Sequence, residues 1–289
     1  MSIREAGSYI GFNRVTSTSQ DSASGIWSLA AAERRRRAAA WPTPFTPSAI
    51  SGLELWLDAS DASTLYDATT GGSLVAANGG VARWEDKSGN SRHFTQSTAE
   101  NRPARKTSDI NGLDAVLFDG SNDVLHRSPE SWAFLYPISV FCVFRATAFT
   151  ASYNALWDFY TASSIGTAGH TGLIKSNGKS AVYTQDTAST SPNYDGNGAV
   201  TYSTATTHIF SASIADNAIS SRGDGASDGS FTDSFTLRTN LGGSNLEIGA
   251  SAKYSRYNEN RIAELIVYSG TLATADRDLI EGYLAAKWQ

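Results

Sequence analysis

Acidic residues that stand close together are the first candidates for chemistry in this sequence. Two carboxylates can cleave a glycosidic bond when they flank it about 5–5.5 Å apart, with retention of configuration, or about 6.5–9.5 Å apart, with inversion. Acids at alternate positions of one strand would share a face of its sheet and could form such a pair. The nearest matches are ELWLD, with Glu54 and Asp58, and WEDK, with Glu85 and Asp86. Both lack either a third acid or the alternation, so we expect no enzyme, with a divergent glycan hydrolase as the least favoured alternative.

Histidine and cysteine offer no better catalytic pattern. The four histidines, His93, His126, His170 and His208, are scattered without the H-E-x-x-H spacing of a zinc site. The single cysteine, Cys142, lies in the apolar run ISVFCVF, which predicts a small buried hydrophobic residue and not a nucleophile. The sequence also contains no Walker or dinucleotide-binding motif.

Oxygen-rich loops could instead hold Ca²⁺, which is bound by carboxylates, amides and backbone carbonyls. The loop DGSND offers Asp119, Asn122 and Asp123. The favoured alternative there is a tight turn in which these side chains accept hydrogen bonds from local backbone amides. The segment GDGASDGS departs from an EF-hand at Ala226 and Phe235. The sequence therefore requires no cofactor and leaves Ca²⁺ open at DGSND.

Two loops carry the side chains that sugar recognition needs. Exposed aromatic rings stack on the CH groups of a pyranose, and planar polar groups bond its hydroxyls. The candidates in SPNYDGNGAVTY and KYSRYNEN are Tyr194, Asp195, Asn197, Tyr202, Tyr254, Arg256, Tyr257, Asn258 and Asn260. An equally weighted alternative is that these tyrosines pack beneath long loops or at a subunit interface.

Composition limits the classes of protein that fit. The 289 residues are 40% hydrophobic and 18% charged, which predicts a folded globular chain and excludes a disordered or coiled-coil protein. Residues 1–45 carry six arginines and three acidic residues and so have a net charge of +3. Because the whole chain has a net charge of −5, the remaining residues have a net charge of −8. An acidic body argues against nucleic acid as a partner. We expect no membrane insertion and no Sec export, since the sequence has neither a long apolar stretch nor a secretory signal.

The elements that would position these residues fall into two parts. Residues 1–50 comprise a polar arm, a short helix at about residues 29–40 and the proline-rich linker PTPFTPSAISG. Residues 51–289 switch to short runs of β-branched and aromatic residues separated by turn formers. We therefore predict an attachment segment, 1–50, and one folded domain, 51–289. The residues that mark the short helix are Trp27, Arg34, Arg35, Arg36, Arg37 and Trp41.

The folded domain is predicted to be all-β. Its expected strands are LELWLD, VARWED, AVLFD, ISVFCVFRA, NALWDFY, TGLIKS, SAVYTQ, THIFSASI, AISSRG, SFTLR, LEIGA and RIAELIVYSG. This number of strands predicts a two-sheet antiparallel jelly-roll sandwich. One C-terminal helix should follow, capped by Thr274 and packed on the sandwich, with the Trp288 side chain buried between helix and sandwich. Trp56, Trp84 and Trp157 alternate with apolar residues and are expected in the core.

The order of these motifs resembles that of the concanavalin A-like, laminin-G-like jelly-roll domains of phage and bacterial surface proteins. The resemblance covers residues 50–289 and rests on GLELWLDASD, VARWEDKSGN, RPARK, LFDGSNDVL, LEIGA and the ending RIAELIVYSGTLATADRDLIEGYLAAKW. The segment ASGIWSLAAAERRRRAAAWP is similar to the sequence that precedes such domains in phage tail and virion structural proteins. Hydrolases that resemble this fold carry E-x-D-x-E or E-x-D-x-x-E, and neither string occurs here.

The resemblance implies a non-enzymatic virion surface protein, a head spike or fibre or a tail fibre, that binds host cell-surface polysaccharide. It would assemble in the bacterial cytoplasm as a homo-oligomer, with Ca²⁺ as a cofactor that some lectin-like sandwiches use. The arginines of residues 34–37 would pair with acidic surfaces of other head or tail proteins, in preference to nucleic acid. The alternative is a structural or decoration protein that binds no sugar.

Overall fold

The computed structural model describes residues 45–127, 137–149, 152–161, 169–185, 198–215, 217–231, 244–251 and 259–289, and the short segments 9–10, 27–28, 193–194 and 256–257. The chain divides into two units, Met1–Ala49 and Ile50–Gln289. In the first unit, β1 (Tyr9–Ile10) pairs antiparallel with β2 (Trp27–Ser28), which contains Trp27. The predicted helix at 29–40, with Arg34, Arg35, Arg36 and Arg37, and the following Trp41 lie outside the described residues.

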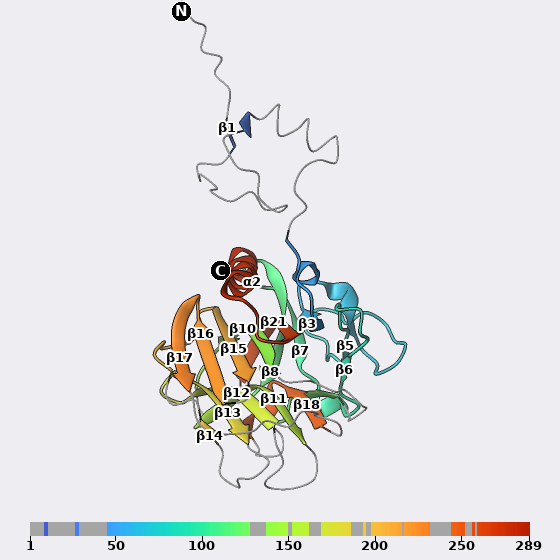
Figure 1. Ribbon diagram of the computed structural model, residues 1–289. Coiled ribbons are helices and arrows are strands. Elements are labelled where there is room, and N and C mark those ends of the chain that lie inside the picture. The colour runs from blue at the N-terminus through green and yellow to red at the C-terminus, as the bar shows by residue number, and fades with distance from the viewer. Residues whose placement is uncertain are drawn as a thin grey trace, which may run out of the picture. The chain divides into compact units, whose positions relative to one another are not determined.

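The second unit is a sandwich of two antiparallel sheets with a helix on one side, as the sequence predicted (Figure 1). One sheet, here called the helix-side sheet, has the order β17-β16-β15-β10-β21-β8-β7, and β3 also pairs with β21. Its strands are β3 (Leu53–Asp58), β7 (Ala104–Ile110), β8 (Leu113–Asp119), β10 (Ile138–Ala146), β15 (His208–Ala215), β16 (Ala218–Gly223), β17 (Ala226–Phe231) and β21 (Glu259–Ser269).

The other sheet, here called the far sheet, has the order β14-β13-β12-β11-β18-β9-β6-β5-β4. Its strands are β4 (Leu65–Tyr66), β5 (Arg83–Trp84), β6 (Phe94–Thr95), β9 (Leu125–Arg127), β11 (Tyr153–Thr161), β12 (Gly169–Lys175), β13 (Ser180–Gln185), β14 (Asn193–Tyr194) and β18 (Ser244–Ile248). A separate hairpin follows β18 and pairs β19 (Ala250–Ser251) with β20 (Arg256–Tyr257).

The core lies between the two sheets because each strand turns alternate residues toward the other sheet. Trp157 of the far sheet stacks on Phe210 of the helix-side sheet, with ring centroids 5.4 Å apart. Gly172 makes room for this pair, since a Cβ at that position would lie 2.2 Å from Trp157 Cζ2. Trp84 is also fully buried, and Cys142 is a buried core residue whose thiol pKa is raised by burial, as expected.

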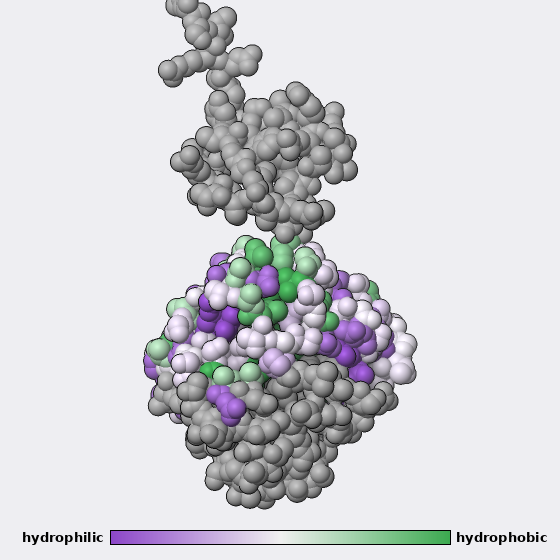
Figure 2. All heavy atoms as spheres, viewed as in Figure 1, coloured by the Kyte–Doolittle hydropathy of each residue, from purple (hydrophilic) through white to green (hydrophobic). Residues whose placement is uncertain are grey.

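The helix α2 (Thr274–Trp288) covers the outer face of the helix-side sheet, which explains why β10 and β21 are apolar on both faces. Its Trp288 is buried, as predicted. The predicted cap is wrong: Ala273 is the N-cap and makes no side-chain hydrogen bond, while Thr274 already belongs to the first turn. Hydrophobic residues gather around α2 on the face seen in Figure 2. Among the described residues, no helix is long and apolar enough to cross a membrane.

A buried carboxylate on the helix-side sheet accepts hydrogen bonds from side chains of α2. Glu264 on β21 is fully buried, and its Oε1 accepts hydrogen bonds from Trp56 Nε1 at 2.7 Å and Tyr283 Oη at 3.0 Å. Its Oε2 accepts from Lys287 Nζ at 2.8 Å and Trp288 Nε1 at 2.7 Å. Trp56 is thus buried between sheet and helix and not between the two sheets.

A second carboxylate, Asp58, completes this attachment. It lies directly opposite Glu264 on β3, and its Oδ1 accepts from Lys287 Nζ at 2.7 Å. Burial raises the pKa of Glu264, helped by the negative charge of Asp58. Burial opposes ionisation of Asp58 too, but Lys287 and other hydrogen-bond donors outweigh it and hold the pKa of Asp58 below its usual value. Lys287 therefore contacts both buried acids, and Lys87 Nζ also pairs with Asp58 Oδ2 at 2.9 Å.

Most expected strands are present, and those missed are short or polar. LELWLD, ISVFCVFRA, SAVYTQ and AISSRG match β3, β10, β13 and β16 residue for residue. The sequence did not predict β4, β6 or β9, which have two or three residues each, because so few residues carry no period. It also missed the polar strands β7 and β17. The expected strand SFTLR lies outside the described residues.

We predict that Glu264→Ala lowers the free energy of unfolding by about 3–5 kcal/mol, because it leaves two buried indole N–H groups without their acceptor and removes one of the two carboxylates that accept from the Lys287 ammonium. Urea denaturation of the full chain, followed by tryptophan fluorescence, measures this loss. Glu259→Ala, at the exposed start of the same strand, is the control and should change stability by less than about 0.5 kcal/mol. Equal stability of the two variants would contradict this account of the attachment of α2.

Candidate functional site

The outer face of the far sheet carries the residues that alternate with its core residues. On β11, Trp157 and Phe159 point into the core, so Asp158 between them faces away from it. On β18, Leu246 and Ile248 are core residues and Glu247 lies between them. The same alternation applies to the other strands of this sheet. The face opposite the core is therefore where two acids, Asp158 and Glu247, come together.

The antiparallel register aligns these outward residues in one row across the sheet. Residues directly opposite each other on neighbouring antiparallel strands share a face, with Cβ atoms about 4.5–5.5 Å apart. Successive register partners from β13 to β4 are Tyr183, Thr171, Asp158, Glu247, His126, Thr95, Arg83 and Tyr66, here called the polar row. With strands about 4.8 Å apart, the row spans roughly 30 Å. His126, Thr95 and Tyr66 are half-buried, and the other five members are buried.

The acids at the middle of the polar row are well enclosed. Asp158 is 1% exposed and Glu247 6% exposed. Asp158 accepts hydrogen bonds from the hydroxyl of Thr171 on β12 and from that of Ser251 on β19. On the other side of Glu247, burial lowers the pKa of His126, which favours the neutral imidazole at neutral pH. The hairpin β19–β20 thus contacts the acid pair through Ser251.

Aromatic rings with an arginine over them lie at both ends of the polar row. Tyr153 and Tyr183 pack edge to face, 5.4 Å between centroids, and the Arg256 guanidinium lies 4.6 Å from the Tyr153 centroid and 5.6 Å from that of Tyr183. At the other end, the Arg83 guanidinium lies 4.1 Å from the centroid of Tyr66. Arg256 is the register partner of Ser251, so one hairpin joins the aromatic cluster to the acid pair.

The two sequence-predicted sugar loops reach this face through described strands. Tyr194 lies on β14 as the register partner of Tyr183, and Tyr257 is half-buried on β20 beside Arg256. Asp195, Asn197, Tyr254 and Asn258 lie outside the described residues, so these candidates stay predictions.

Two loop residues predicted to face a sugar are instead buried. Asn260 is fully buried. Tyr202 is 2% exposed, packs with the core, and donates from Oη to Asp228 Oδ2 at 3.0 Å. Asp228 also accepts from Val200 N at 2.6 Å and from Ser180 Oγ. The segment GDGASDGS is accordingly a β-hairpin turn with a buried structural acid, and loop composition misplaced Tyr202 because Asp228 supplies its polar partner.

The DGSND loop has the geometry of a tight turn. Asp119 Oδ1 accepts from Ser121 N at 2.8 Å and Asn122 N at 3.3 Å, and Asp123 Oδ2 accepts from Asp119 N at 2.9 Å. Burial and the neighbouring charge of Asp119 raise the pKa of Asp123 to about 6. In the described part of the chain, no group of three or more His, Cys, Asp or Glu residues is arranged to hold a metal. The Ca²⁺ hypothesis for Asp119, Asn122 and Asp123 stays a prediction.

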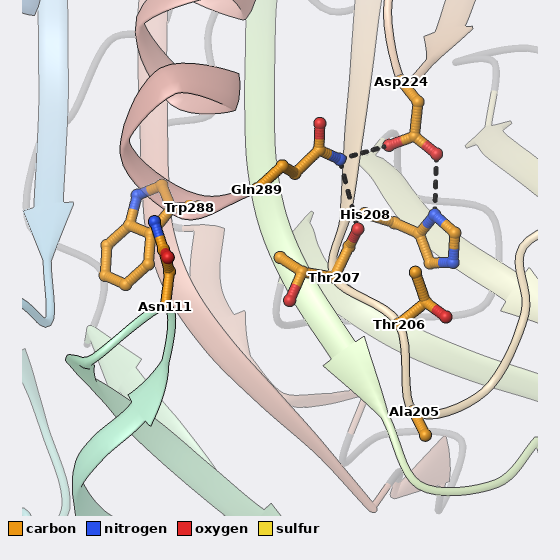
Figure 3. A pocket seen from close by; sticks show the side chains of 8 residues that line it. All are labelled: Asn111, Ala205, Thr206, Thr207, His208, Asp224, Trp288 and Gln289. Atoms are coloured by element: carbon orange, nitrogen blue, oxygen red, sulfur yellow. Dashed lines mark hydrogen bonds and ion pairs between the residues drawn. The ribbon is translucent and has the colours of Figure 1, made fainter.

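A separate surface pocket of about 550 Å³ is lined by Asn111, Ala205, Thr206, Thr207, His208, Asp224, Trp288 and Gln289 (Figure 3). His208 Nδ1 lies 2.7 Å from Asp224 Oδ2, and Ser203 Oγ lies 3.3 Å from His208 Nε2. However, the Ser203 backbone N–H also donates to Nε2 at 3.1 Å, and Ser203 Oγ donates to Thr206 Oγ1 at 3.0 Å. The hydrogen bonds of His208 therefore connect the turn that contains Ser203 and Thr206 to the β16–β17 hairpin that contains Asp224. Ser203 Oγ donates to Thr206 and not to His208, so Ser203 is not activated as a nucleophile.

Comparison with known proteins supports the fold. No protein family and no curated protein matches the sequence. Domain 4 of AbnA, a GH43 extracellular arabinanase from Geobacillus stearothermophilus solved in complex with arabinotriose, is similar over 78% of this chain and 97% of its own (14% identity, TM-score 0.53). Trypanosoma rangeli sialidase is similar over 82% of this chain (12% identity, TM-score 0.50), and a GH54 α-L-arabinofuranosidase over 72% (12% identity, TM-score 0.50). This chain spans 33% of the sialidase and 51% of the arabinofuranosidase.

These structures correct the expectation that the chain is not an enzyme. All three names are those of glycosidases or of one domain of a glycosidase, so this sandwich fold occurs in sugar-cleaving enzymes. The absence of the E-x-D-x-E string excludes only a catalytic arrangement in which the acids alternate along one strand. Asp158 and Glu247 come from two neighbouring strands, a pairing that a search along one strand does not detect.

We predict that Asp123→Asn stabilises the protein at pH 7 and that its advantage disappears below about pH 4. The folded pKa of about 6 exceeds the unfolded value near 3.9, so the folded state holds an extra proton between these values and wild-type stability falls as pH rises through them. The gain at pH 7 should be on the order of 2 kcal/mol, since the amide oxygen can still accept from Asp119 N.

Urea denaturation of both proteins at pH 4, 5, 6 and 7 measures this difference. A difference that does not change with pH would show that Asp123 is not protonated in the folded state. Repeating the pH 7 series with CaCl₂ tests the Ca²⁺ hypothesis, because a bound ion would stabilise the wild type and not Asp123→Asn.

Proposed function

We propose that residues 50–289 recognise carbohydrate along the polar row on the outer face of the far sheet. The observation that carries this proposal is the continuous row of hydroxyl, carboxylate, imidazole and guanidinium groups with aromatic rings at both ends. A sugar presents alternating hydroxyls and apolar CH faces, and such a row complements both. The fold shared with domain 4 of an arabinanase, solved with arabinotriose, supports the same class of ligand.

The central part of the row suits hydroxyl groups particularly well. Asp158, Glu247 and Thr171 are buried, so the groups that would meet sugar hydroxyls there are the half-buried Thr95 and His126, which can donate and accept hydrogen bonds. The cluster of Tyr153, Tyr183 and Arg256 supplies ring faces and a planar donor beside them. Because these residues belong to strands and a hairpin, their positions are fixed before a ligand arrives, which lowers the entropy cost of binding.

We also propose, from the sequence resemblance alone, that the protein is a virion surface protein whose carbohydrate is a host cell-surface polysaccharide. Residues 1–50 would join the domain to a head or tail protein through Trp27, Trp41 and the arginines at 34–37. The contrast between net +3 in residues 1–45 and −8 in the rest supports a different partner for each part. Several copies on one particle would let a weak site in each copy achieve firm attachment.

We predict that Arg256→Ala and Tyr257→Ala each weaken carbohydrate binding about three- to ten-fold while leaving thermal melting nearly unchanged. Losing one stacked contact costs about 0.5–1.5 kcal/mol. A glycan array probed with the full chain first identifies a bound oligosaccharide, and calorimetric titration then compares the variants. Arg261→Ala, which removes an arginine paired with Asp109 on the helix-side sheet, is the matched control and should bind normally. An array without any binding contradicts the proposal and favours a structural or decoration role.

We predict that deleting residues 1–45 leaves a domain that melts as the full chain does but no longer joins particles. The core is formed by residues of the second unit, so the deleted segment contributes nothing to it within the described part of the chain. Particles assembled with the truncated protein can be purified and its copy number measured by quantitative mass spectrometry. Incorporation at the full-length level would contradict the attachment role of this segment.

A further inference from the structure

The surface pocket beside His208 is built on the helix-side sheet, whereas the polar row belongs to the far sheet. Its walls come from the turn between β7 and β8, the turn before β15, the β16–β17 hairpin and the end of α2. Its volume of about 550 Å³ falls within the roughly 300–1,000 Å³ of small-molecule sites. We propose that this pocket binds a small molecule that carries a primary ammonium group and several hydroxyl groups, as an amino sugar does. The inference is independent of the proposed function.

One carboxylate gives the pocket its charge. Among the eight described residues that line it, Asp224 is the only acid and none is a lysine or an arginine. The Asp224 side chain is 33% exposed, so a ligand in the pocket can reach it. Burial opposes its ionisation, but hydrogen bonds from His208, the Ile209 backbone N–H and Gln289 outweigh burial and hold the pKa of Asp224 below its usual value. The carboxylate is therefore ionised at neutral pH.

Neither His208 nor Lys287 neutralises this carboxylate. His208 Nε2 accepts from the Ser203 backbone N–H at 3.1 Å, as a nitrogen of a neutral imidazole does. Lys287 precedes Trp288 in α2, but its Nζ pairs with the two buried acids beneath the helix. The last turn of α2, which ends at Trp288, adds the partial negative charge of a helix C-terminus. The electrostatic field in the pocket therefore favours a cation and disfavours an acidic ligand.

Hydrogen bonds within the protein leave acceptors exposed in the pocket. Gln289 Nε2 donates to Thr207 O at 3.1 Å and to Asp224 Oδ1 at 3.0 Å, which uses both of its hydrogens (Figure 3). Asn111 Nδ2 donates to Lys287 O at 2.9 Å. Gln289 and Asn111 are exposed, so their amide oxygens can accept from a ligand. An ammonium group, which has three donors and no acceptor, and the hydroxyls of a sugar both complement such oxygens.

The turn before β15 adds two hydroxyl groups to the pocket. Thr206 is exposed and Thr207 is half-buried, and a hydroxyl both donates and accepts. The preceding Ala205 has a φ of 61°, a left-handed conformation that is uncommon for alanine, and its N–H donates to Ala146 O at 2.8 Å. Strained residues of this kind cluster at ligand sites. The pocket thus offers one charged and several neutral partners, which matches an ammonium group carried on a polyhydroxylated ring.

Two-dimensional NMR of the ¹⁵N-labelled full chain tests this inference with three ligands at equal ionic strength. D-glucosamine should shift the amides of Thr206, Thr207, Asp224 and Gln289. N-acetyl-D-glucosamine lacks the ammonium group and propylamine lacks the hydroxyls, so each should bind at least about ten-fold more weakly. Equal binding of either one overturns the assigned ligand class. D-glucosamine shifts along the polar row in place of the pocket overturn the inference and support the proposed function, and an absence of shifts overturns the inference alone.

Variants locate the charge that the ligand recognises. Asp224→Asn should lower the affinity for D-glucosamine about ten-fold or more, and Thr207→Val, which removes a hydroxyl without changing charge, about three- to ten-fold. Asp278→Asn removes the same charge from an exposed acid on α2, so it is the matched control and should bind as the wild type does. Equal losses in Asp224→Asn and Asp278→Asn overturn the assignment. If melting curves show that Asp224→Asn is unfolded, unchanged binding by Thr207→Val overturns it instead.

Discussion

The alternation of side chains along strands that share one core constrains everything on the surface of this sandwich. Trp157, Phe159, Leu246 and Ile248 must face the helix-side sheet, and this requirement turns Asp158 and Glu247 to the opposite face. A slip of one residue in either strand would move an acid into the core. The same packing that stabilises the fold therefore also fixes which residues form the polar row.

Each of the two outer faces of the sandwich places two acidic side chains directly opposite each other, and their surroundings differ. Each carries a pair of opposed, buried acids, which repel one another unless something compensates them. On the helix-side sheet, Lys287 of α2 supplies a positive charge and the pair becomes part of the attachment of the helix. On the far sheet, Asp158 accepts hydrogen bonds from the hydroxyls of Thr171 and Ser251.

The sequence predicts the sandwich well and the site only in part. Long strands such as β10 and β21 have clear apolar patterns, and the turn formers between strands mark their ends. Tyr257 and Arg256 were chosen from loop composition and do lie beside the aromatic cluster. Asp158 and Glu247 were missed because only the register between distant strands pairs them. The available signal was an acid inside an otherwise apolar strand, as in NALWDFY, since a charge there must face away from the core.

Carbohydrate binding by the outer face of the far sheet is the proposal on which the functional interpretation of this protein depends. Titration of the ¹⁵N-labelled chain with an oligosaccharide, followed by two-dimensional NMR, tests this claim most directly. We expect the amide shifts to change along the polar row, at Thr171, Asp158, Glu247 and Tyr183, and on the β19–β20 hairpin, while those of α2 stay fixed. Shifts confined to α2 or to the pocket beside His208 would contradict it.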